Sequence, residues 1–99
     1  MPYFKVQLSG TGISFRVVDG SDPAIGFFTT RLVRAKNADH AHSSAKATVL
    51  SEWRPGGDYA GGNRGALPSL TVEESWQVGL VAGILGRKGG GYSFYSHDD

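Results

Sequence analysis

The sequence of 99 residues contains no cysteine. It can therefore form no disulfide, and it offers neither a thiol nucleophile nor a thiolate ligand for a metal ion. Small secreted domains often depend on disulfides, so the absence of cysteine favours a reducing compartment. The first residues also lack the apolar run and the cleavage site of a signal peptide. We therefore expect a cytoplasmic protein.

Long apolar runs and an excess of charge of either sign are also missing. The longest apolar stretch, residues 78–85, covers about eight residues, whereas a membrane-spanning helix needs about 20. Ten Lys and Arg against nine Asp and Glu leave a net charge of +1. General affinity for nucleic acid requires a concentrated basic surface. The composition therefore predicts no membrane partner and disfavours nucleic acid.

The patterns of common catalytic and metal sites do not occur. No nucleophile elbow or triad spacing surrounds the serines and threonines. His40 and His42 are two residues apart, so on a helix their side chains diverge by about 200° and cannot share a metal ion. We interpret His42 as a histidine at the edge of the core with one hydrogen-bond partner. The sequence thus predicts no cofactor and no metal, and it favours a protein that is not an enzyme.

Alternating apolar and polar residues dominate the first third of the chain, which is the pattern of half-buried strands. Residues 3–8 and 13–17 alternate on either side of the turn-forming residues 9–12, so we expect a hairpin there. A third strand, residues 26–35, carries large apolar groups on both faces and should be central. The length is typical of one domain, which we expect to cover the whole chain.

A helix over residues 37–53 is the clearest element. Asn37 is a good N-cap, because its side chain can accept a hydrogen bond from a backbone N–H of the first turn. Pro55 ends the helix, because it restricts the residue before it. Small and then larger apolar residues follow one helical stripe: Ala38, Ala41, Ala45, Val49 and Trp53.

Two glycine-rich segments, residues 55–67 and 79–91, follow the helix, and we expect the first to be a mobile loop. Strands are expected at residues 69–78, with Leu70 to Val78 alternating on one face, and at residues 92–95. The order β-β-β-α-β-β predicts an α+β fold. Its sheet should be antiparallel or mixed, with four to five strands and one main helix on one face.

One helix can cover only one face of such a sheet. The other face must be polar or covered by a partner, and Phe27, Val33 and Val18 are candidates for it. This predicts a homodimer or another protein partner. The residues that we expect to contact a ligand or partner are Phe27, Arg31, Glu74, Trp76, Arg87 and Lys88. Glu74 is expected to pair with Arg31 or Arg34 if their strands are adjacent.

Two segments have the chemistry of an anion site. Residues 86–91 combine glycines with Arg87 and Lys88, so backbone amides and two cations could hold a phosphate. The segment lacks P-loop spacing, however, and a loose basic loop is the simpler interpretation. Residues 12–16 loosely resemble the anion-binding turn of acylphosphatases, which implies a phosphate held by backbone amides and Arg16. In that family the turn opens a helix, whereas Arg16 lies within an alternating segment, so we expect a strand with an exposed arginine.

Three stretches resemble a known group of proteins: GFFTTRLVRA at 26–35, PSLTVEE at 68–74 and GYSFY at 91–95. With the capped helix between the first two, they resemble small uncharacterised bacterial proteins of about this length. The shared pattern of that group is GF(F/Y)TTR, VEE and GFxFY. The resemblance implies an α+β, ferredoxin-like fold and no established activity. The chain departs from the pattern at Ser75-Trp76, so the pattern does not fix the strand register after Glu74.

These observations favour a non-enzymatic binding or protein-interaction module. The alternative is a small protein or enzyme that binds a phosphate ligand, with Arg31, Arg87 or Lys88 acting beside Glu74. A third interpretation is nucleic-acid binding, because Trp76 and nearby tyrosines could stack on bases next to the basic glycine-rich loop.

Overall fold

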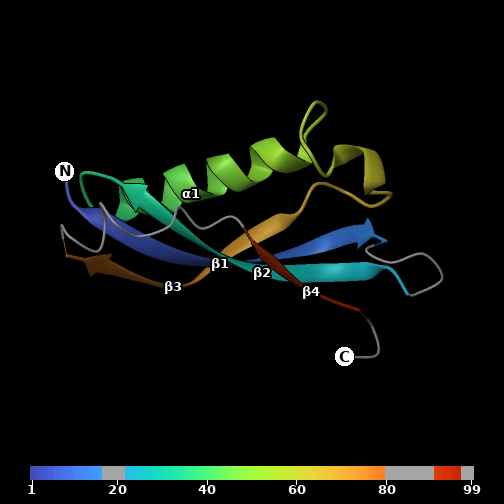
Figure 1. Ribbon diagram of the computed structural model, residues 1–99, viewed down its shortest axis with the longest axis horizontal. Coiled ribbons are helices and arrows are strands. Elements are labelled where there is room, and N and C mark those ends of the chain that lie inside the picture. Colours follow the sequence, from blue (N-terminus) through green and yellow to red (C-terminus); the bar gives the residue numbers. More distant parts are fainter. Residues whose placement is uncertain (17–21, 80–90, 97–99) are drawn as a thin grey trace.

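The computed structural model describes residues 1–16, 22–79 and 91–96. Its elements are β1 (Tyr3–Phe15), β2 (Ala24–Arg34), α1 (Ala38–Trp53), the short 3-10 helix η1 (Ala60–Gly62), β3 (Ser69–Val78) and β4 (Tyr92–Tyr95). The strands form one antiparallel sheet in the order β3-β1-β2-β4. Helix α1 lies along one face of this sheet (Figure 1). The expected α+β class, with one helix on a mainly antiparallel sheet, is confirmed.

The prediction of a hairpin with its turn at residues 9–12 is wrong. Residues 9–12 lie inside β1, where Gly10 pairs with Phe27 of β2 and with Leu70 of β3. Gly12 has a φ of 89°, and the register with β2 shifts after Thr11. The glycine therefore distorts the strand without reversing it. The first hairpin is formed by β1 and β2, and the described elements follow the order β-β-α-β-β.

The ferredoxin-like arrangement is not confirmed. That fold contains two helices in a β-α-β-β-α-β order, whereas the described residues form one α-helix and the strand order β3-β1-β2-β4. The central position expected for the 26–35 strand is correct, because β2 lies between β1 and β4. Among the described residues, no helix combines the length and apolarity that crossing a membrane requires.

Helix α1 begins and ends where its sequence predicts. The Asn37 side chain accepts a hydrogen bond from the backbone N–H of His40 at 2.8 Å. Arg54 leaves the helix with φ −77° and ψ 160°, the extended geometry favoured before Pro55. The buried residues of the helix are Ala41, Ala45, Val49 and Trp53. Ala38 is exposed, so the stripe that contacts the sheet begins one turn later than expected.

The core lies between α1 and the sheet. The ring of Phe27 covers Gly10, where a Cβ atom would collide with it, and stacks on Trp53 at 5.4 Å between ring centroids. Phe27 is fully buried, and Val33 pairs with buried Phe4 on the same side. Both were expected on the opposite face, and the structure corrects this. Val18, the third such residue, is outside the described residues.

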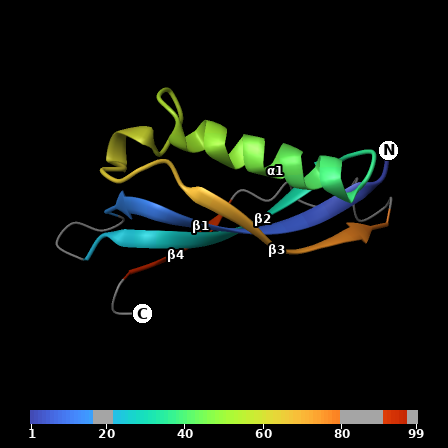
Figure 2. The ribbon, with the colours of Figure 1, turned by 180° about the vertical axis from the view of Figure 1, so that it is seen from behind.

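The opposite side of the sheet, which we call the outer face, carries the alternate residues of each strand. Its main side chains are Tyr3, Lys5, Gln7, Ser9, Phe28, Thr30, Leu32, Arg34, Glu73, Glu74, Trp76 and Tyr95. In the described part of the chain, no element lies over it, and Figure 2 shows the helix only on the other side. The β1–β3 register shifts between Gln7 and Leu8, so the residues of β3 before and after this point alternate in opposite senses between the two faces of the sheet. Leu70 and Val72 therefore face α1, whereas Trp76 and Val78 do not, which corrects the expected single alternation.

Candidate functional site

Arg31, one of the six candidates, lies on the covered face and is only 5% exposed. Its guanidinium forms a forked ion pair with Glu52 of α1, at 2.7 Å and 3.2 Å, and its Nε donates to Thr29 Oγ1 at 3.0 Å. Tyr92 of β4 donates to the same carboxylate at 2.5 Å, and the Arg31 guanidinium lies over its ring. Each nitrogen of the Arg31 guanidinium and the Tyr92 hydroxyl therefore has a partner within the protein.

The protonation states of this cluster are fixed by the same contacts. Burial disfavours the ionised carboxylate, but hydrogen bonds from Arg31 and Tyr92 outweigh it and hold the pKa of Glu52 below its ordinary value. Burial also disfavours the charge on Arg31, yet its bonds to Glu52 raise its pKa. Burial raises the pKa of Tyr92, and donation to Glu52 raises it further. The cluster is a charged pair with a neutral phenol, and its role is to join α1, β2 and β4.

Glu74 does not pair with Arg31 or Arg34. Strand β1 lies between β2 and β3, so the two strands that carry these residues are not neighbours. Glu74 aligns with Gln7 and is exposed on the outer face. The partner of Arg31 is instead Glu52 of α1, which the sequence pattern did not connect with Arg31 because the two residues meet only when the helix packs on the sheet.

Of the remaining candidates, Phe27 is part of the core, and Trp76 is exposed on the outer face, where it aligns with Lys5. Arg87 and Lys88 are outside the described residues, so the phosphate cradle expected at 86–91 stays a prediction. Of the four described candidates, Phe27 and Arg31 lie on the covered face, where both contact Tyr92. Glu74 and Trp76 lie on the outer face, on the same side of β3.

The outer face exposes large aromatic side chains. Phe28 is 42% exposed and Trp76 is 44% exposed. The Phe28 ring contacts the ring of Tyr95 at 5.7 Å between centroids, and Tyr95 lies over Gly26, where a Cβ atom would collide with it. Single exposed apolar side chains are common, but several on one face of a sheet form a surface suited to binding.

Charged residues of both signs accompany these rings. Lys5 and Arg34 lie toward the end of the sheet that contains Tyr3, and Arg34 is over the Tyr3 ring at 5.9 Å. Glu73 lies further along, where it accepts a hydrogen bond from Ser9 Oγ at 2.6 Å. Glu74 is beside it. The outer face is therefore electrically mixed, with its basic and acidic residues in separate places.

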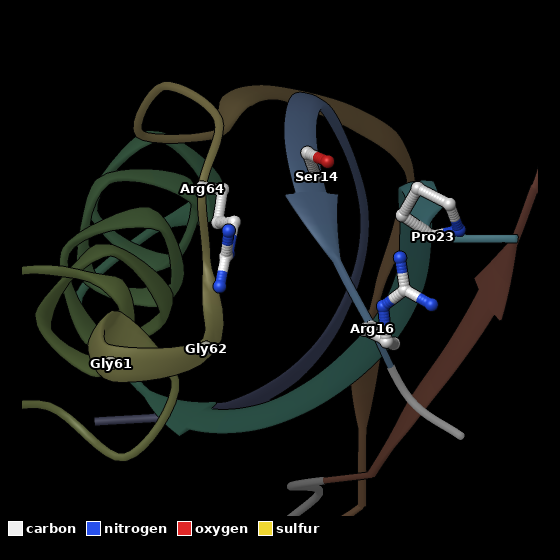
Figure 3. Close-up of a pocket in the computed structure, with 6 residues that line it drawn as sticks. All are labelled: Ser14, Arg16, Pro23, Gly61, Gly62 and Arg64. Atoms are coloured by element: carbon white, nitrogen blue, oxygen red, sulfur yellow. The ribbon is translucent and has the colours of Figure 1, made fainter. Parts of the chain in front are cut away.

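A second feature is a cavity of about 440 Å³ at the C-terminal end of β1, where residues 61–64 pass beside the strand. It is lined by Ser14, Arg16, Pro23, Gly61, Gly62 and Arg64. Figure 3 shows Arg16 and Arg64 on two sides of the cavity, with Ser14 between them. The sequence drew attention to Arg16 but not to Arg64, because the glycine-rich segment that carries Arg64 has no periodicity.

The histidine prediction is confirmed for His42, whose Nε2 lies 2.7 Å from Ser75 Oγ. His40 Nδ1 accepts a hydrogen bond from the backbone N–H of Lys36 at 3.1 Å. In the three described ranges, no group of three or more His, Asp or Glu side chains is placed to hold a metal ion. His40 therefore bonds to the backbone just before α1, and His42 links α1 to β3.

Comparison of the chain with models of protein families, with curated proteins and with solved structures finds no match. The resemblance to the small bacterial group stays a prediction.

Proposed function

We propose that this protein is a non-enzymatic interaction module whose outer face binds the outer face of a second copy of the chain. The observation that carries the proposal is the exposure of Phe28 and Trp76 on one sheet face, beside charged residues of both signs. Aromatic residues are enriched in protein interfaces, and Trp and Tyr often dominate their binding energy. The opposite face is already filled by α1.

The distribution of charge supports a second copy as the partner. Lys5 lies two residues before Gln7 on β1, and Ser9, which contacts Glu73, lies two residues after it. A two-fold axis that crosses the strands near Gln7 turns Lys5 of one copy toward Glu73 of the other. A two-fold interface repeats each contact, so this pairing forms twice.

The area of the outer face limits how tightly two copies of the chain can bind. β1 pairs with both neighbours over residues 3–11, about 30 Å at about 3.3 Å per residue, so the face of the sheet has an area of about 500 Å². A standard interface buries about 800 Å² per partner, so this one is small. We expect a reversible dimer with a dissociation constant in the micromolar range.

The same face disfavours nucleic acid. Glu73 and Glu74 balance Lys5 and Arg34, so the surface offers no net positive charge to a phosphate backbone. The exposed rings could stack on bases, which makes oligonucleotide binding the main competing outcome of the test.

Sedimentation equilibrium from about 1 to about 300 µM tests the proposal, because a micromolar dimer changes its average mass within this range. Wild-type protein should shift from one chain to two. Trp76→Ser should remain a monomer, whereas Leu67→Ser, which removes another exposed apolar side chain (48% exposed) outside the sheet, should behave as wild type. A monomer at every concentration contradicts the proposal, and salt-dependent binding of oligonucleotides by that monomer would favour the nucleic-acid alternative.

A charge exchange tests the two-fold arrangement itself. Lys5→Glu and Glu73→Lys should each weaken the dimer, because each places like charges together twice. The double variant should associate more strongly than either single one. Single and double variants that dimerise equally well would exclude this pairing and require another orientation of the two copies.

A further inference from the structure

The cavity beside β1 is built by a segment that sequence analysis expected to be mobile. Asn63 Oδ1 accepts hydrogen bonds from the backbone N–H groups of Ser14 and Gly65, both at 3.0 Å. The backbone N–H of Arg64 donates to Ser14 O at 2.9 Å, and that of Ala66 donates to Gly12 O at 3.0 Å. This part of the segment therefore follows β1 closely, and the position of Arg64 is fixed by its own backbone.

Glycine makes this close approach possible. A Cβ atom at Gly65 would lie 2.6 Å from the backbone nitrogen of Ser14, and one at Gly62 would lie 2.5 Å from the Phe15 ring. Either side chain would push the segment away from the strand. At Gly61, in contrast, an added Cβ meets nothing within 4 Å, because this residue borders open space.

The polar side chains among the described lining residues can all donate hydrogen bonds. Arg16 and Arg64 carry guanidinium groups, which donate but cannot accept, and Ser14 adds a hydroxyl. No carboxylate is among the lining residues described. The Arg64 guanidinium forms no hydrogen bond or ion pair with the described residues, whereas its backbone is held in place. Such a site complements a ligand that brings negative charge and acceptor oxygens.

From this geometry we propose that the cavity is a binding site for the oxyanion group, phosphate or carboxylate, of a small organic molecule. Its volume lies within the usual range of about 300–1,000 Å³ for small-molecule sites. Arg64 is the principal cation, Arg16 faces it across the cavity, and Ser14 supplies a neutral donor (Figure 3). None of the residues that line this site belongs to the dimer surface, so the two proposals stand or fall separately.

The test is a titration followed by ¹H–¹⁵N correlation spectra, with pyrophosphate as the phosphate probe and citrate as the carboxylate probe. Sodium chloride keeps the ionic strength constant, because screening alone can mimic or remove weak contacts between charges. We expect saturable shifts confined to the amides of Ser14, Gly61, Gly62 and Arg64 and to the Arg64 Nε–H. Saturation with pyrophosphate alone assigns a phosphate ligand, and saturation with citrate alone assigns a carboxylate.

Matched variants separate this site from general charge effects. Arg64→Gln should weaken binding about tenfold or more, the scale of one lost charge-assisted hydrogen-bond pair. Arg54→Gln removes the same charge from an exposed position at the helix end, outside the cavity, and should bind as wild type. Ser14→Ala should weaken binding several-fold.

Two results would overturn the proposal. One is the absence of saturation with both probes, or shifts spread over all exposed basic residues. The other is equal binding by Arg64→Gln and Arg54→Gln in folded protein, as judged by their unchanged spectra elsewhere. The mass of the protein in solution bears on the dimer alone, so it cannot be confused with either result.

Discussion

The two faces of the sheet contain similar residue types but differ in how far these residues are buried. Each has a tryptophan, other aromatic rings, and charged residues of both signs. On the face under α1, Trp53 is 2% exposed and the Arg31–Glu52 pair is closed by Tyr92. On the outer face, Trp76 is 44% exposed. Among the described residues, no buried side-chain nitrogen or oxygen lacks a hydrogen-bond partner.

This difference shows why residue type alone does not locate a working surface. A buried arginine with a complete set of partners stabilises the fold, because its binding capacity is used internally. An exposed ring on a flat sheet can still gain contacts. The covered face therefore accounts for the stability of the protein, and the outer face remains able to bind.

The largest expected difference between the faces comes from their two tryptophans. Trp53→Ala should lower the free energy of unfolding by about 3–5 kcal/mol, because it opens a cavity beside Phe27 and Tyr59. Trp76→Ala should lower it by less than about 1 kcal/mol in the monomer. Urea unfolding at low protein concentration measures both. Equal losses would contradict the assignment of the two faces.

The next effect concerns the ion pair on the covered face. Glu52→Gln should cost about 2–4 kcal/mol, because Arg31 stays buried without a counter-charge. The folded pKa of Glu52 lies below its ordinary value of 4.5, so its stabilising contribution is complete above that pH and is lost as the pH falls through the folded value.

Urea unfolding of wild-type protein and Glu52→Gln between about pH 7 and about pH 3 checks the pH dependence, since this range spans ordinary carboxyl pKa values. The wild type should lose more stability on acidification than the variant. Parallel losses in both proteins would show that Glu52 does not contribute to acid sensitivity, and that the pair is weaker than its geometry indicates.

A smaller effect should distinguish glycines that are packed from those that border open space. Gly10→Ala places a methyl group into the Phe27 ring and should cost about 1–3 kcal/mol. Gly61→Ala meets no atom within 4 Å and should change stability by less than about 1 kcal/mol. Thermal unfolding of the two variants makes the comparison. A harmless Gly10→Ala would mean that Phe27 does not lie against β1.

Local signals predicted much of the fold. The cap at Asn37, the stop before Pro55 and the stripe from Ala41 to Trp53 are properties of nearby residues, and the helix follows them. The turn signal at residues 9–12 failed because pairing with strands on both sides stabilises extended backbone there. Glycines and a serine favour a turn only when no neighbouring strand competes.

The candidate site was harder to predict, because it depends on which strands are neighbours. The alternation in β2 places Phe27 and Phe28 on opposite faces of the sheet, but only the position of α1 decides which of them is buried. The expected pairing of Glu74 with Arg31 or Arg34 required their strands to be adjacent, and β1 lies between them. The sequence did not single out Arg64, because backbone hydrogen bonds to residues far away in the sequence fix its position.

The central claim is that the outer face binds a second copy of the chain, and the exposure of Trp76 tests it most directly. In a Trp53→Phe variant, Trp76 is the single tryptophan, since the sequence has two. Acrylamide quenching of its fluorescence should fall as protein concentration rises from about 1 to about 300 µM, the range in which a micromolar dimer forms. Strong quenching that stays constant over this range would contradict the claim.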